Sequence, residues 1–141
     1  LAALTRLEWL TGDPRRSLEL AELVLASERP SPNARWTALF TLATAYFDAN
    51  HFEAAIPVLE QLVRMRRFAD AWYMLSICRE GTGDLTAAVD AAEKAIAINP
   101  YAPELQLRLA ELHRRRGHDR QAAIHETRAR QLAEPRPGGS K

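Results

Sequence analysis

The feature that most constrains the fold is an internal repeat with a period of about 34 residues. Three segments align with one another, Trp36 to about Arg67, Ala69 to Pro100 and Pro103 to about Glu134, and each starts about one period after the previous one. A partial copy, Leu1 to about Arg29, precedes them. A unit of this length cannot bury its apolar face alone, so we expect neighbouring copies to stack around one continuous core.

Each copy contains two stretches of helical periodicity that are separated by a short break. In the copy that starts at Ala69, apolar or small residues recur at spacings of three and four on both sides of Gly83-Asp84. Gly83 can adopt the left-handed conformation that ends a helix, and the Asp84 carboxylate can accept hydrogen bonds from the first N–H groups of the next. Asn50 and Gly117 stand at the equivalent positions. The pattern predicts one helical hairpin per copy and no strand.

The predicted helices span about 1–11, 14–28, 32–49, 52–66, 69–81, 84–98, 102–116 and 119–133. They form hairpins at about 1–29, 33–67, 68–101 and 102–133, within one domain at 1–133. Residues 134–141 have the sequence EPRPGGSK, which offers almost nothing apolar to bury, and we expect a flexible tail there.

These residues resemble the tetratricopeptide repeat family. The resemblance rests on Trp72, Leu75, Gly83-Asp84, Ala88, Ala95 and Asn99-Pro100, with Leu39, Ala43, Tyr46, Ala55 and Leu59 in the preceding copy and Leu109, Ala110, Gly117, Ala122 and Ala129 in the last. Small residues at such positions allow two helices to approach closely. The resemblance implies an all-α fold, a right-handed α–α superhelix (solenoid) of about three and a half to four hairpins.

In this family the first helix of each hairpin lines a concave groove. The resemblance therefore implies a protein-interaction scaffold that binds a peptide or partner protein through Phe40, Thr44, Phe47, Tyr73, Ile77, Arg108 and Glu111. The middle of this set is apolar and its end is charged, as an apolar peptide with a fixed direction would require. The alternative is that the aromatic side chains fill space between neighbouring helices. A different alternative for the function is an accessory C-terminal segment of a multidomain enzyme or electron-transfer protein whose chemistry lies upstream.

Composition excludes several other classes of function. Nineteen basic and 18 acidic residues leave a net charge of +1, so no global field attracts nucleic acid or an anionic membrane surface. No apolar run approaches the roughly 20 residues that span a bilayer. Cys78 is the only cysteine, which excludes an internal disulfide and favours a reducing compartment such as the cytoplasm.

The sequence predicts no enzyme activity, metal site or cofactor within these residues. His113 and His118 are separated by a turn, and their spacing is not that of metal ligands on a helix. His125-Glu126 begins like a zinc motif, but Ala129 stands where the second histidine belongs. Cys78 lies on an apolar helix face, where a buried, unreactive thiol is expected.

Three further expectations concern the last hairpin, Glu80 and the N-terminal hairpin. Gln106, His113, Glu126 and the arginines around them predict a solvent-facing terminal hairpin, because terminal repeats need a polar outer face. Glu80 is expected on a free helix face, so Glu80→Ala should have little effect on stability. Self-association through the N-terminal hairpin, by the helix from Leu1 to Leu10, is an additional alternative for the partner.

Overall fold

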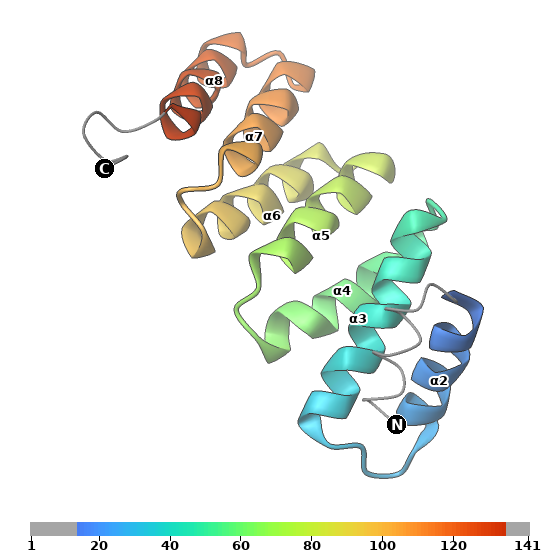
Figure 1. Ribbon diagram of the computed structural model, residues 1–141. Helices are drawn as coiled ribbons and strands as arrows, with labels where there is room; N and C mark the ends of the chain where they lie inside the picture. The colour runs from blue at the N-terminus through green and yellow to red at the C-terminus, as the bar shows by residue number, and fades with distance from the viewer. Residues whose placement is uncertain (1–13, 135–141) are drawn as a thin grey trace, which may run out of the picture. The chain divides into compact units, whose positions relative to one another are not determined.

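The computed structural model of the chain describes residues 14–134, which form seven α-helices and no strand (Figure 1). The helices are α2 (Pro14–Ala26), α3 (Pro32–Asp48), α4 (Phe52–Met65), α5 (Ala69–Gly81), α6 (Leu85–Ile98), α7 (Pro103–Arg115) and α8 (Asp119–Ala133). The predicted all-α fold is therefore confirmed. The predicted helix at 1–11, with its proposed role in self-association, and the tail from residue 135 lie outside the described residues.

Helix ends follow the signals in the sequence. Asn50, Gly83 and Gly117 have positive φ angles of 60°, 90° and 78°, which is the left-handed conformation predicted for the breaks. The Asp84 carboxylate accepts a hydrogen bond from the Ala87 N–H at 3.0 Å, so its predicted capping role is confirmed. The ends of these seven helices lie close to their predicted positions.

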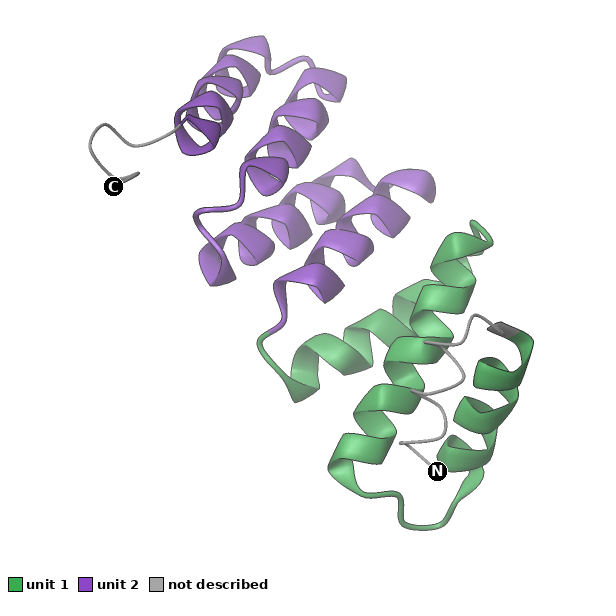
Figure 2. Ribbon diagram, viewed as in Figure 1, with its two compact units in different colours: residues 1–67 green, residues 68–141 purple. Residues whose placement is uncertain are grey.

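The chain divides into two compact units, residues 1–67 and 68–141, and the boundary falls between two predicted hairpins (Figure 2). In unit 1, α3 packs against both α2 and α4. Ala21 and Val24 of α2 form a cluster with Ala38 of α3, while Leu59 and Leu62 of α4 are fully buried. Among the described helices of unit 1, α3 is thus the one that packs against the other two. A single solenoid domain at 1–133 stays a prediction.

Unit 2 contains the hairpins α5–α6 and α7–α8, and α7 also packs against α6. The α6–α7 core combines small residues of α6, such as Ala88 and Ala92, with Leu109 and Leu112 of α7. Ala95 lies in a second cluster nearer the end of α6. Ala88 and Ala95 are both fully buried, as expected for residues at close helix crossings.

Candidate functional site

The seven predicted binding residues lie on first helices in both units. Unit 1 carries Phe40, Thr44 and Phe47 on α3, and unit 2 carries Tyr73 and Ile77 on α5 with Arg108 and Glu111 on α7. The two groups are considered separately because they belong to different units.

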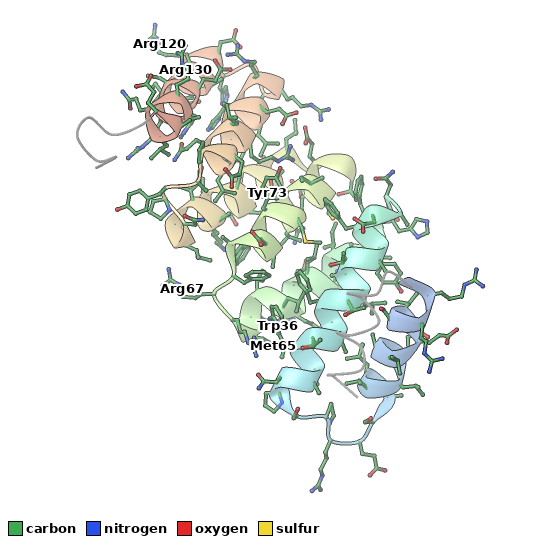
Figure 3. The ribbon with its side chains drawn as sticks, viewed as in Figure 1. Trp36, Met65, Arg67, Tyr73, Arg120 and Arg130 are labelled. Atoms are coloured by element: carbon green, nitrogen blue, oxygen red, sulfur yellow. The ribbon has the colours of Figure 1, made fainter. Side chains whose placement is uncertain are left out.

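The α3 group is largely engaged in packing within unit 1. Trp36 of α3 is labelled in Figure 3. Phe40 stacks on it with ring centroids 5.2 Å apart, and the Arg66 guanidinium lies 4.6 Å from the centroid of the Trp36 ring. Phe47 contacts Phe52, the first residue of α4, at 6.1 Å between centroids. Thr44 is half-buried, and its hydroxyl oxygen has no hydrogen-bond partner among residues 14–134. These aromatic side chains therefore stabilise α3 and leave only part of each ring accessible.

Unit 2 carries apolar residues on both of its first helices, one of them exposed. Tyr73 and Ile77 are half-buried on α5, where Tyr73 packs against the cluster of Ala102 and Leu105 at the start of α7. Leu107 is 51% exposed on α7, and it occupies the position of the next repeat that is equivalent to Tyr73. The sequence analysis missed Leu107, although the repeat register could have identified it. Tyr73, Ile77 and Leu107 together place apolar surface on both first helices of unit 2.

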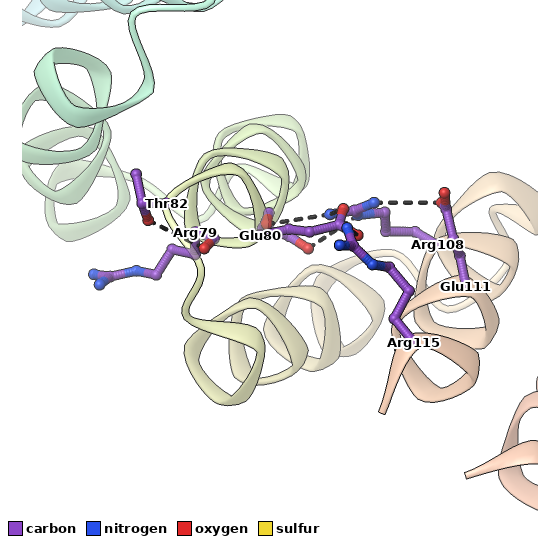
Figure 4. Close-up of polar contacts among 7 residues, drawn as sticks. Arg79, Glu80, Thr82, Arg108, Glu111 and Arg115 are labelled. Atoms are coloured by element: carbon purple, nitrogen blue, oxygen red, sulfur yellow. Dashed lines mark hydrogen bonds and ion pairs between the residues drawn. The ribbon is translucent and has the colours of Figure 1, made fainter. Parts of the chain in front are cut away.

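Arg108 connects these two helices. Its side chain is only 6% exposed, and its Nη2 atom lies 2.6 Å from Oε1 of Glu80 on α5 (Figure 4). Its Nε donates to the Ser76 hydroxyl at 3.1 Å, and its Nη2 donates to the Ser76 carbonyl at 3.2 Å. Charge-assisted hydrogen bonds of this kind are strong and directional. Arg108 therefore fixes α7 against α5, a role that the sequence did not predict.

Glu80 is the acceptor at the centre of this network. Its side chain is 11% exposed and forms ion pairs with both Arg108 and Arg115 (Figure 4). Burial alone would raise the pKa of the Glu80 carboxyl, but hydrogen bonds from the two arginines outweigh burial and lower the pKa below its usual value. The expectation that Glu80 lies on a free helix face is therefore wrong. Glu111, whose side chain is 63% exposed, accepts from Arg108 at 3.3 Å and forms the open end of the network.

The polar residues of the last hairpin are arranged differently from the prediction. Gln106 and His113 were expected to face solvent, but they are 3% and 7% exposed and lie inside the α7–α8 hairpin. The prediction was wrong for these two residues because each has a polar or aromatic neighbour on α8. Gln106 Oε1 lies 2.8 Å from His125 Nδ1, and the rings of His113 and His125 stack with centroids 5.5 Å apart. Glu126 is partly exposed, and its carboxylate pairs with Arg114.

The described residues show little potential for other chemistry. Cys78 is fully buried, and burial raises the pKa of its thiol to about 11, which disfavours the reactive thiolate. Across residues 14–134, no three metal-ligating side chains are arranged to hold a metal ion. Nor does this part of the chain include a helix with the length and apolarity to cross a bilayer.

Comparison with known proteins supports the repeat architecture. Residues 40–103 match the family model described as tetratricopeptide repeat, which confirms the resemblance predicted from the sequence. Among solved structures, MamA from Desulfovibrio magneticus RS-1 is 23% identical, with a TM-score of 0.79 over 93% of this chain and 72% of that chain. MamA of AMB-1 is 20% identical, with a TM-score of 0.81 over 96% and 72%. At these identities the likeness establishes a shared fold. No curated protein matches the sequence.

Proposed function

Because residues 40–103 match the tetratricopeptide repeat, we propose that the chain is a protein-interaction scaffold whose unit 2 binds a partner peptide along α5 and α7. The family supports a scaffold in general terms, and the finer proposal rests on the residues of the two helices. Its central observation is the buried Arg108, which holds α5 and α7 together through Ser76 and Glu80. A recognition surface with fixed spacing loses less conformational entropy when a peptide binds.

The apolar residues define the chemistry of the peptide. Tyr73 and Ile77 are half-buried and Leu107 is half-exposed, so a peptide with large apolar side chains would remove further apolar area from water at all three. Exposed charged groups of both signs, Glu111 and Arg115, lie on α7 beside this surface. Both lie in the last turns of α7, so they favour a peptide that carries its charged groups at one end, which sets its direction.

Phe40, Thr44 and Phe47 form a separate candidate surface on α3. Their aromatic rings already contact Trp36 and Phe52, so the contribution of this surface to binding is proposed to be smaller than that of unit 2. The two surfaces make independent predictions because they belong to different units.

Peptides selected from a displayed random library against the immobilised chain provide the test. Their dissociation constants would be measured by fluorescence anisotropy for the wild type and for single variants. Leu107→Ala and Tyr73→Ala should each weaken binding at least tenfold, since removal of a central apolar contact commonly has an effect of this size. Phe40→Ala should weaken binding less.

Ile124→Ala is the matched control. Ile124 is 60% exposed on α8, close to the exposure of Leu107, and it lies away from the proposed surface. Binding by this variant should equal that of the wild type. Normal affinity in Leu107→Ala and Tyr73→Ala, with unchanged helical circular dichroism, would show that the peptide docks elsewhere.

A further inference from the structure

The α7–α8 hairpin has an unusual interior for a helical repeat, because it contains a pair of stacked imidazoles. The rings of His113 on α7 and His125 on α8 are nearly parallel, with an interplanar angle of 10° and centroids 5.5 Å apart. His113 is 7% exposed, and its Nδ1 atom is buried with no hydrogen-bond partner among residues 14–134. His125 is partly buried and uses Nδ1 in its contact with Gln106. The pair therefore has little access to water that could stabilise a positive charge.

The charged groups around this pair disfavour protonation as well. His118, at the start of α8, lies 5.9 Å from the His113 ring, and Arg116 follows the end of α7. Arg128, on α8 itself, also disfavours protonation of His125, whereas Glu93 of α6 favours protonation of both rings. Burial is the largest cause that lowers the pKa of His113 and of His125. For His113 the next causes are the charges of His118 and Arg116. For His125 they are the charges of His113 and Arg128.

The buried residues of α8, Ala122 and Ala129, are equivalent to Ala88 and Ala95 of α6. Between them, His125 stands at the position of the buried Ala91. The contacts of His125 with His113 and Gln106 are therefore part of the packing that holds α8 against α7.

We propose that the His113–His125 pair makes the attachment of α8 to α7 sensitive to acid, so that protonation of the imidazoles releases α8. With α8 detached, both rings reach water and can carry the charge at little cost. The detached state then binds more protons than the packed state. The packed hairpin is fully stable above about pH 6.5, the usual pKa of histidine, and loses stability as the pH falls below that value.

Hydrogen–deuterium exchange of the intact chain at pH 7.5 and pH 5.5 tests the proposal, with rates corrected for the intrinsic effect of pH on exchange. Most carboxylates remain ionised at both values, so histidines dominate the difference. The opening equilibrium of α8 should rise at least tenfold at pH 5.5, while that of α6 should change less than twofold. In the double variant His113→Leu/His125→Ala, the response of α8 should fall below twofold.

Two controls complete the design. His51→Gln, at the start of α4 in unit 1, should keep the full wild-type response of α8. Proton NMR titration of the wild-type histidine rings should give pKa values for His113 and His125 below 6.5, and this measurement requires no variant to fold. The proposal is overturned if both rings titrate at or above 6.5, or if exchange in α8 does not respond to pH. A full acid response that persists in a folded double variant overturns it equally.

Discussion

The two hairpins of unit 2 share one repeat pattern but differ in the face that each presents to the following helix. On α6, Val89 and Ala92 are 6% and 1% exposed because α7 packs against them. The equivalent residues on α8 are Ala123, which is exposed, and Glu126, which pairs with Arg114. The same backbone position is therefore apolar where another helix covers it and charged where none of the described helices does. The difference teaches that equivalent positions of one repeat pattern change their chemistry with their surroundings.

The hairpin interiors differ too. Trp72 of α5 packs against the cluster that contains Ala95, whereas the equivalent residue of α7 is Gln106. Gln106 is nevertheless buried, because His125 supplies a hydrogen-bond partner. The helical hairpin thus tolerates either an apolar or a polar interior, provided that buried polar groups find partners.

The largest loss of stability is expected when the residue at one position of α6 is replaced by the equivalent residue of α8. Ala92→Glu places a carboxylate in the α6–α7 core without a partner, and we expect a loss of about 4 kcal/mol in the free energy of unfolding. Glu126→Ala removes only a partly exposed ion pair and should cost less than about 1 kcal/mol. Urea denaturation followed by circular dichroism measures both. Similar losses would mean that the two hairpins do not differ as described.

The second largest loss of stability is expected from a substitution in the buried network between α5 and α7. Glu80→Ala leaves Arg108 buried without its main counterion and should destabilise the chain by about 3 kcal/mol. Asp90→Ala is the control, since it removes an exposed carboxylate that pairs with Lys94 on α6 and should cost less than about 0.5 kcal/mol. If the two variants unfold at the same urea concentration, the network does not stabilise unit 2.

Overpacking provides a second comparison between α6 and α8. Ala88→Leu adds volume at a fully buried crossing and should cost about 2 kcal/mol, whereas Ala123→Leu on the exposed face of α8 should be close to neutral. The melting temperatures of the two variants provide the measurement. A strong effect of Ala123→Leu would indicate that this face of α8 is covered in solution.

Local signals explain why the helices were predictable from the sequence. The conformations of Asn50, Gly83 and Gly117 depend on steric rules that act within a few residues, so the breaks between helices follow from the residue types. The repeat then places the apolar face of each helix, because equivalent positions have equivalent neighbours. Ala88 and Ala95 were assigned correctly to helix crossings for this reason.

The polar contacts were not predictable in the same way. Arg108 and Glu80 belong to different repeats, and no periodicity indicates that a long flexible side chain will reach across to another helix. Gln106 and His113 were assigned to the surface because a terminal repeat is expected to present a polar outer face. That rule fails where two polar side chains satisfy each other in a packed hairpin, as Gln106 and His125 do.

The central claim is that α5 and α7 carry the recognition surface of this scaffold. Its most direct test is amide NMR of the isotopically labelled full chain during titration with a selected peptide. The account predicts that the largest shift changes fall on residues near Tyr73, Ile77 and Leu107, and that α6 and α8 are perturbed only weakly. Shift changes confined to α6 and α8, or to α3 alone, would contradict it.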